Sequence, residues 1–431
     1  MHDTFNEVNM LIEFSVSNYG SFDHLQTLSF KATKLESSSE EVEISNIMIR
    51  GDNRYLKLCG LYGANASGKS NFIKALGVFK EMVVSSVVAE GYSTSAVNPF
   101  RQSKDGLKRP SFFQIILLLS GKRYRYGFTL KTNGGIGSEW LFGPADKNET
   151  YYFKRTGENI QSNSEWFPEG YSLPEDNLRP DALFLSFCSS YNGQISKEIR
   201  GFLHRQVTFD AKIRLSRKVG IMFGSRGLST NHLIDNGEEG MVLNWFKEVG
   251  LPYTGIRIMK EDGYLGSVLL SKNIFDDDGN IVGQTEMDLN RDESEGTRKF
   301  YSYIGRLYKK FTEGGLYVVD EIDSNFHPSL LQKIIKLFQN QNINKANAQL
   351  LFTSHDTNLM DPMIMRRDQF YFAEKTVYDS TKLYSLADLK GIRNNTDFAR
   401  QYLAGLYGAL PILGDYLEDD SINFNQDVQE I

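Results

Sequence analysis

The chain has 431 residues, of which 40% are hydrophobic and 24% charged, a composition typical of a folded globular protein. Its net charge of −6 argues against a strongly basic nucleic-acid binder, although a local basic groove is compatible with an acidic average. Its two cysteines, Cys59 and Cys188, have no disulfide or metal-site spacing. With no signal peptide and no apolar run of about 18 residues, we expect a cytoplasmic protein without membrane contact.

The N-terminal part of the chain reads as strands followed by a helix. Two short strands are expected within Leu11–Phe30, around a turn at Asn18–Ser21. A strand at Tyr55–Leu61 precedes a glycine-rich loop, and a helix runs from Lys69 to about Val83. Residues 112–142 alternate like a hairpin that turns at Gly121-Lys122. We expect an antiparallel subdomain here.

The C-terminal part alternates between helices and strands. The pattern is mostly helical from about 180 to 260, and a hairpin is expected over 265–288. After Ser294 the sequence predicts a helix, a buried strand at Leu316–Val319, a helix from Pro328 and a strand at Leu350–Thr353. This alternation predicts a mixed α/β fold.

The loop from Gly63 to Ser70 matches G-x-x-x-x-G-K-[ST] completely. Glycines let successive backbone N–H groups curl around a phosphate, and the lysine reaches the β- and γ-phosphates while the hydroxyl contacts Mg²⁺. The helix that begins at the loop adds its positive dipole end. The nucleotide-binding residues expected here are Gly63, Asn65, Ala66, Ser67, Gly68, Lys69, Ser70 and Asn71.

The strand Leu316–Val319 ends in two acids, Asp320 and Glu321. Paired carboxylates at the end of a buried strand are costly unless a cation or hydrogen bonds neutralise them. Asp320 suits a Mg²⁺ shell together with Ser70, and Glu321 suits polarising the water that attacks the γ-phosphate. The competing interpretation is a strand whose acids enter a solvated loop.

Two further polar elements indicate function less strongly when each is taken alone. His355 lies two residues after the strand at Leu350–Thr353. A neutral imidazole there could hydrogen-bond to a γ-phosphate or to the attacking water. The alternative is a purely structural histidine. Ser294, Gly296 and Thr297 open a helix and could form an anion site, although any helix can begin with such a cap. Their position around the Asp320-Glu321 strand makes function the favoured interpretation for both.

In this order the four elements resemble the ATP-binding cassette class in its soluble branch, which includes SMC, RecF and the ATPase parts of OLD proteins. The resemblance implies an ABC-class P-loop core with an antiparallel β-subdomain and a helical lobe. Lys69, Glu321 and His355 would be catalytic, with His355 as the switch histidine. Residues 294–297 would be the signature that contacts the ATP of a second copy, and Asp323 falls at the D-loop.

A closer resemblance is to the OLD-like "AAA" ATPases of bacterial anti-phage and toxin–antitoxin loci, including the PARIS, Septu and abortive-infection systems. It rests on five segments, which are Asn18–Phe22, Tyr124–Phe128, Asp323–Pro328, Arg366–Gln369 and Tyr402–Pro411. The family often has Arg where Tyr19 stands here. Arg50 and Arg54 lie nearby in sequence, but nothing selects either as a replacement.

From this resemblance we expect four parts, with boundaries at 10–180 (first ATPase lobe), 181–290 (helical lobe with a hairpin), 291–411 (second ATPase lobe) and 412–431 (acidic tail). The expected cofactors are ATP and Mg²⁺. Only 20 residues follow Pro411, so we expect no Toprim nuclease module. The triple acid Asp276–Asp278 precedes Gly279-Asn280 and is expected to be a hairpin tip rather than a metal site.

The expected function is ATP hydrolysis within an ATP-linked homodimer or larger homo-oligomer. This ATPase would sense infection, with a phage-derived trigger, and control a separately encoded effector, most plausibly a nuclease or toxin. The alternative is a RecF- or SMC-like DNA-repair ATPase; the chain has no heptads between Gly68 and Ser294, which disfavours the SMC form. A transporter subunit is the third possibility. Nucleic-acid binding stays open.

Overall fold

The computed structural model describes residues 9–88, 90–145, 148–171, 173–174, 177–210, 228–261 and 264–411. The acidic tail predicted at 412–431 lies outside the described residues. A six-stranded sheet holds the centre, in the order β11-β15-β16-β5-β17-β18. Its strands are β11 (Val207–Asp210), β15 (Leu316–Val319), β16 (Gln349–Thr353), β5 (Leu58–Tyr62), β17 (Phe370–Lys375) and β18 (Thr381–Ser385).

The central sheet is parallel except at its β18 edge. Parallel strands are buried on both faces, and β5, β15 and β16 are buried throughout. Along β15, Leu316 and Val318 face the core that contains α2 (Lys69–Ser85). Tyr317 and Val319 face the opposite core, built with α9 (Glu295–Glu313) and α10 (Pro328–Gln339).

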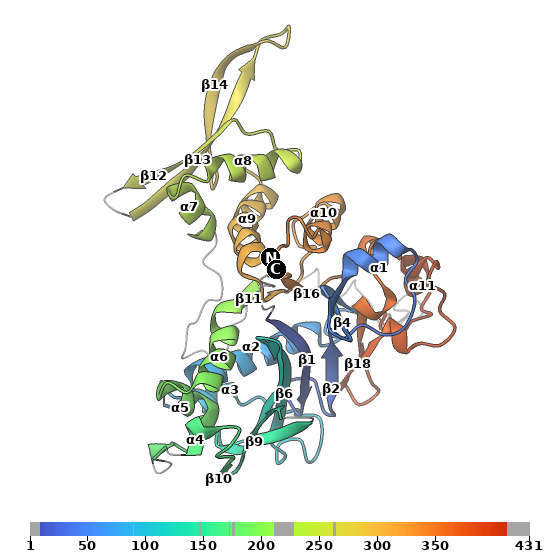
Figure 1. The fold of residues 1–431 in the computed structure, drawn as a ribbon. Helices are drawn as coiled ribbons and strands as arrows, with labels where there is room; N and C mark the ends of the chain where they lie inside the picture. The colour runs from blue at the N-terminus through green and yellow to red at the C-terminus, as the bar shows by residue number, and fades with distance from the viewer. Residues whose placement is uncertain are drawn as a thin grey trace, which may run out of the picture.

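A seven-stranded antiparallel sheet lies beside it, in the order β10-β9-β8-β7-β6-β1-β2 (Figure 1). Its strands are β1 (Met10–Ser17), β2 (Gln26–Ser29), β6 (Ser111–Leu119), β7 (Lys122–Leu130), β8 (Ile136–Pro144), β9 (Glu149–Thr156) and β10 (Asn159–Ser162). One face of this sheet packs on α2: Phe14 of β1 and Phe128 of β7 both contact Phe79 of that helix.

A third unit projects from the body next to α9 (Figure 1). It contains α7 (Leu228–Asp235), α8 (Glu239–Glu248) and a sheet of β12 (Gly255–Glu261), β13 (Tyr264–Phe275) and β14 (Ile281–Asp288). Its core joins Phe246 and Leu270 to Phe300 and Ile304 of α9. The helix that begins at the predicted signature, α9, is therefore also the base of this projection.

The remaining elements are short. They are α1 (Glu40–Asn46), β3 (Ile47–Arg50), β4 (Asn53–Leu56), α3 (Tyr92–Ala96), α4 (Pro168–Tyr171), α5 (Phe184–Ser190), α6 (Gln194–Gly201), the π-helix Phe202–Gln206, α11 (Phe398–Leu403) and 3₁₀ turns at Thr357–Leu359, Arg367–Gln369 and Leu386–Asp388. In the described part of the chain, no helix is long and apolar enough to cross a membrane.

The predicted mixed α/β fold is confirmed, and three details differ from the prediction. The strand expected at Tyr55–Leu61 is broken at Lys57, whose buried ammonium donates to the carbonyl of Gln339 (2.9 Å). Within the region predicted to be mostly helical, 207–210 and 255–261 are strands. Both are stabilised by pairing with strands distant in sequence or in a hairpin, which local periodicity does not reveal.

Candidate functional site

The glycine-rich loop joins the carboxyl end of β5 to α2, as the sequence predicts. Gly63 and Gly68 have φ of 143° and 112°, and Ala66 has 61°. A Cβ at Gly63 would lie 2.3 Å from the carbonyl oxygen of Ala373, and a Cβ at Gly68 2.2 Å from Oγ1 of Thr381. Both positions therefore require glycine, for space as well as for φ.

Residues far away in sequence hold this loop in place. The N–H of Ala64 donates to the carbonyl of Ala409 (2.9 Å), and Oγ1 of Thr381 donates to the carbonyl of Ser67 (2.7 Å). Nδ2 of Asn71 donates to Oγ of Ser21 (3.0 Å). Two segments singled out in the sequence, around Ser21 and around Ala409, thus brace the loop from opposite ends of the chain.

Lys69 is buried, and its ammonium donates to the carbonyls of Gly63 (2.7 Å) and Ala64 (2.9 Å). Burial lowers its pKa to about 8, against the attraction of the carboxylates of Asp320, Asp323 and Glu321. The Lys69 ammonium donates to loop carbonyls in the free protein. Phosphate oxygens are stronger hydrogen-bond acceptors and can replace these carbonyls.

Asp320 lies across the sheet from the loop, directly after β15. Its Oδ1 accepts hydrogen bonds from Oγ of Ser70 (3.2 Å) and Oγ1 of Thr353 (2.6 Å). The same Thr353 hydroxyl accepts from the N–H of Glu321 (2.7 Å). Thr353 was not singled out in the sequence. A hydroxyl at the last position of a buried apolar strand is the signal that could have found it.

Glu321 has φ of 53°, a left-handed conformation that costs a non-glycine residue about 1–2 kcal/mol. The bond from its N–H to Thr353 and the next one, from the N–H of Ile322 to the carbonyl of Thr353 (3.0 Å), hold this turn. The backbone strain therefore occurs at a residue predicted to be catalytic.

His355 follows β16 and lies near the same carboxylates. Its N–H donates to Oδ2 of Asp323 (3.0 Å), while Oδ1 of Asp323 is buried without a hydrogen-bond partner in the described residues. Loss of surrounding water and the charge of Lys69 lower the pKa of His355, despite opposing attraction from Asp323, Glu321 and Asp320. The lowered pKa favours the neutral imidazole.

The segment predicted to be the signature forms the start of a helix. Oγ of Ser294 caps α9 by accepting the N–H of Thr297 (3.1 Å), and the two hydroxyls lie 2.9 Å apart. A Cβ at Gly296 would lie 2.9 Å from the carbonyl oxygen of Asn325. Among the described residues, no hydrogen bond joins this segment to residues 63–70.

The residue at the family's arginine position takes a structural role. Tyr19 is buried, its ring contacts Phe113 edge-on at 5.3 Å between centroids, and burial raises its pKa to about 12. Arg54 pairs with Glu43, and Arg50 donates to the carbonyl of Ile49 (2.8 Å). Neither arginine hydrogen-bonds to a loop residue in the described structure.

The Asp276–Asp278 acids form a hairpin tip between β13 and β14, as predicted. Oδ1 of Asp276 accepts the N–H groups of Asp278 (3.1 Å) and Asn280 (2.8 Å). Across the described residues, no group of three or more His, Cys, Asp or Glu side chains is placed to hold a metal ion.

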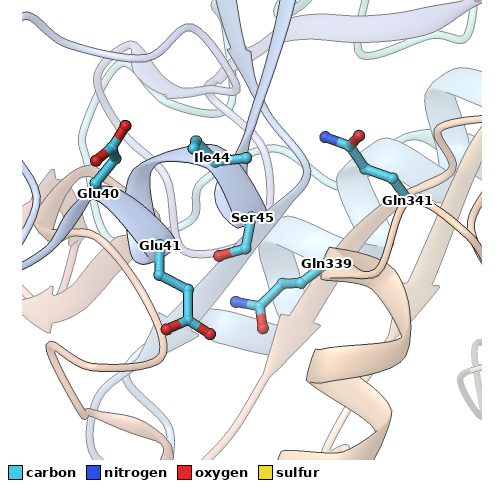
Figure 2. Close-up of a pocket in the computed structure, with 6 residues that line it drawn as sticks. All are labelled: Glu40, Glu41, Ile44, Ser45, Gln339 and Gln341. Carbon is cyan, nitrogen blue, oxygen red and sulfur yellow. The ribbon is translucent and has the colours of Figure 1, made fainter.

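A hollow of about 440 Å³ lies elsewhere, between α1 and the end of α10 (Figure 2). Its walls are Glu40, Glu41, Ile44, Ser45, Gln339 and Gln341. None of the residues predicted to bind nucleotide lines this hollow. The candidate site is instead the edge of the central sheet where β5, β15 and β16 end.

The sequence pattern described as "AAA domain, putative AbiEii toxin, Type IV TA system" matches residues 58–361. No curated protein matches the chain. Three SMC head domains are similar in structure. That from Thermotoga maritima is 14% identical over 87% of this chain and 98% of its own, with a TM-score of 0.38.

The second is an SMC head with an extended coiled coil bound to the C-terminal domain of ScpA, from Pyrococcus furiosus. It is 11% identical, covers 93% of this chain and 100% of its own, and has a TM-score of 0.42. The third, from Pyrococcus yayanosii, is an SMC head with a coiled coil and joint. It is 9% identical, with the same coverage and a TM-score of 0.43. Similarity this low carries no argument about function.

Proposed function

The chain belongs to the family of AAA domains described as putative AbiEii toxins of type IV toxin–antitoxin systems, and we propose that it binds ATP with Mg²⁺ and hydrolyses it between two copies of itself. The observation that carries this proposal is the cluster of Lys69, Ser70 and Asp320 at one end of the central sheet. Each of these groups supplies one requirement of nucleotide binding.

The residues fit ATP and Mg²⁺. Gly63, Ala66 and Gly68 hold the loop in the positive-φ backbone that turns N–H groups toward an anion. The hydroxyl of Ser70 and the carboxylate of Asp320 are hard oxygen donors 3.2 Å apart, the ligand type that Mg²⁺ prefers. When bound, Mg²⁺ neutralises charge on the phosphates.

The chain's own groups divide the reaction among them. Lys69 binds and orients the β- and γ-phosphates, and Thr353 fixes the carboxylate of Asp320. Glu321 accepts a proton from the attacking water. Neutral His355 donates to the γ-phosphate or orients that water. The positions and charges of these groups support the proposed roles, and substitution of each residue tests them.

The site is completed by a second copy. Ser294, Gly296 and Thr297 present a helix N-terminus, a place that favours anions, but no hydrogen bond joins them to their own chain's loop in the described structure. A two-fold dimer would place the signature of each copy against the γ-phosphate of the other, in the isologous arrangement common to homodimers.

Replacing Lys69 by Ala tests nucleotide binding. Loss of the ammonium should weaken ATP binding about 10- to 100-fold, the scale of hydrogen bonds to charged groups. Isothermal titration of ATP with Mg²⁺ measures it. Lys74→Ala is the matched control because Lys74 is an exposed lysine on the same helix. Equal affinities of the two variants would contradict the proposal.

We propose further that the ATPase serves bacterial anti-phage defence, as sensor and scaffold for a separately encoded effector that is a nuclease or toxin, with a phage-derived trigger. The family description, which names a toxin–antitoxin system, supports this role. Co-expression with the product of the adjacent reading frame should reduce cell growth, and Glu321→Gln should change that toxicity. A neighbourhood of replication or recombination genes, with no toxicity, would favour the repair alternative.

A further inference from the structure

The antiparallel sheet has a second, outward face that the ATPase does not use. Its inner face carries the core residues Tyr126 and Phe128 on β7. The alternate positions point outward, and the strand registers place them in rows: Gln114, Gly127, Trp140 and Lys154 lie side by side, followed by Arg125, Phe142 and Tyr151. This outer face, which we call the aromatic face, also includes Phe112 on β6.

The rings of the aromatic face lie along the sheet with cations beside them. Phe112 stacks on Trp140 with centroids 5.3 Å apart. The guanidinium of Arg125 lies 4.0 Å from the ring centre of Phe142, and the ammonium of Lys154 lies 5.5 Å from Phe142 and 5.1 Å from Tyr151. Cations over ring faces interact favourably with them, which keeps this layer ordered.

Gly127 explains why Trp140 lies flat. A Cβ at Gly127 would lie 2.5 Å from Cζ2 of Trp140, so any other residue would displace the indole. Nε1 of Trp140 donates to Oε1 of Gln114 (3.2 Å), which fixes the ring further. The Tyr124–Phe128 segment noted in the sequence therefore has a role: its outward glycine makes room for a flat aromatic platform.

A basic loop adjoins the aromatic face just before β6. Arg101, Lys104 and Lys108 are exposed, and with Lys154 they form no ion pair among the described residues. The side chain of Asn18 fixes this loop by donating to the carbonyls of Gly106 (2.9 Å) and Arg109 (2.6 Å). The loop also holds one exposed acid, Asp105, and Glu13 of β1 lies in the row of Arg125 and Phe142. Glu149, near the opposite edge, pairs with Arg123 and Arg125.

We propose that the aromatic face binds single-stranded nucleic acid, with bases on Trp140 and Phe142 and phosphates on Lys154 and the basic loop. Aromatic platforms flanked by cations bind single strands with little sequence preference. Strands β6 to β9 span about 14 Å at the usual strand spacing, the width on which a four-stranded sheet stacks about two or three bases. Unpaired cations favour this polyanion over an acidic protein partner.

Fluorescence anisotropy with a fluorescein-labelled (dT)12 strand tests the proposal. We expect binding in about the micromolar range in 50 mM NaCl that weakens as salt rises, because phosphate contacts release counterions. Trp140→Ala and Phe142→Ala should each weaken it about 5- to 100-fold, and Lys154→Gln should also reduce the salt dependence. Lys345→Gln, an exposed lysine beyond α10, is the matched control and should bind like the unmodified protein.

A spectroscopic readout separates stacking from a structural effect. The chain has three tryptophans, so replacing Trp166 and Trp245 by Phe leaves Trp140 as the reporter, and unlabelled (dT)12 should quench its emission. Lys69→Ala should keep the full affinity for (dT)12, so this proposal and the ATPase proposal fail independently.

Three results would overturn the proposal. One is no saturable binding up to about 100 µM strand in 50 mM NaCl. A second is binding that Trp140→Ala and Phe142→Ala leave unchanged, or that is equally tight for a 12-base-pair duplex. A third is a sedimentation shift showing that Trp140→Ala dissociates an oligomer while (dT)12 does not bind, which would assign the aromatic face to a second copy of the chain.

Discussion

The two large sheets of this protein offer different places for function. The central sheet is parallel and covered on both faces, by cores that contain α2 on one side and α10 on the other. The antiparallel sheet is covered on one face by α2, and on the other face Trp140 and Phe142 are partly exposed. Both sheets contribute to the core that contains α2. Their candidate sites nevertheless differ, because one lies at strand ends and the other on a sheet face.

The comparison shows which strand positions are available for functional side chains in each kind of sheet. In the parallel sheet, side chains that alternate along a strand are all buried, so only the strand ends are free, and Asp320, Glu321 and His355 all follow the last residue of a strand. In the antiparallel sheet, one residue in two along β7 and β8 points outward, so a whole face is available. The first arrangement suits a precise catalytic cluster and the second an extended ligand.

The largest expected effect compares the two faces of the antiparallel sheet. Phe128→Ala removes a fully buried ring and should lower the free energy of unfolding by about 3–5 kcal/mol. Phe142→Ala, on the aromatic face, should cost no more than about 1 kcal/mol because its ring is only partly covered. Urea unfolding measures both. Similar losses of unfolding free energy in the two variants would mean that the outer face is a hydrophobic core, and the two faces would not differ as described.

At the strand ends, the sharpest test is Glu321→Gln. The amide keeps the size and the left-handed turn but cannot take a proton, so kcat should fall at least ~10²-fold while ATP still binds. Steady-state phosphate release and ATP titration measure the two parts. Glu158→Gln, in an exposed turn, serves as the control. Hydrolysis by Glu321→Gln at the unmodified rate would refute the assigned mechanism.

The buried position of Lys69 predicts a pH effect that the exposed cations of the aromatic face should not share. Burial lowers its pKa to about 8, so the free site loses its ammonium as the pH rises through 8. ATP binds the protonated form, hence its affinity should fall by up to about tenfold per pH unit above 8. Binding of (dT)12 should stay constant over the same range. In Lys69→Arg, ATP affinity should no longer fall above pH 8. A fall that persists would show that deprotonation of Lys69 is not its cause.

The smallest expected effect concerns pairing between copies. Lys69→Ala and Ser294→Arg should each be inactive, but a mixed dimer keeps one intact composite site. Random mixing makes half of the dimers mixed, so activity should return to about a quarter of the unmodified level in a two-fold arrangement. Mixed dimers that are proven by mass and remain inactive would show that the signature does not serve the neighbouring site.

The sequence alone predicted the fold class and most elements around the site. Local chemistry suffices where one short segment carries the whole signal: the loop at Gly63–Ser70 needs glycines, a lysine and a hydroxyl in fixed order, and α2 follows it as expected. The strands β15 and β16 were also predicted, within one residue, because runs buried on both faces are continuously apolar. The hairpins at 111–130 and 264–288 followed from alternation and turn residues.

The sequence by itself thus determined the residue types of the candidate nucleotide site and the α/β pattern, while the nucleotide contacts and the catalytic roles of Glu321 and His355 stay predictions. Only the tertiary structure decided which distant residues share a site: Thr353 with Asp320, Ala409 with the loop, and the rings of the aromatic face with one another. The reason is physical. Periodicity reports which side of a strand is apolar, but the register between strands, set by packing of the whole sheet, decides which side chains become neighbours.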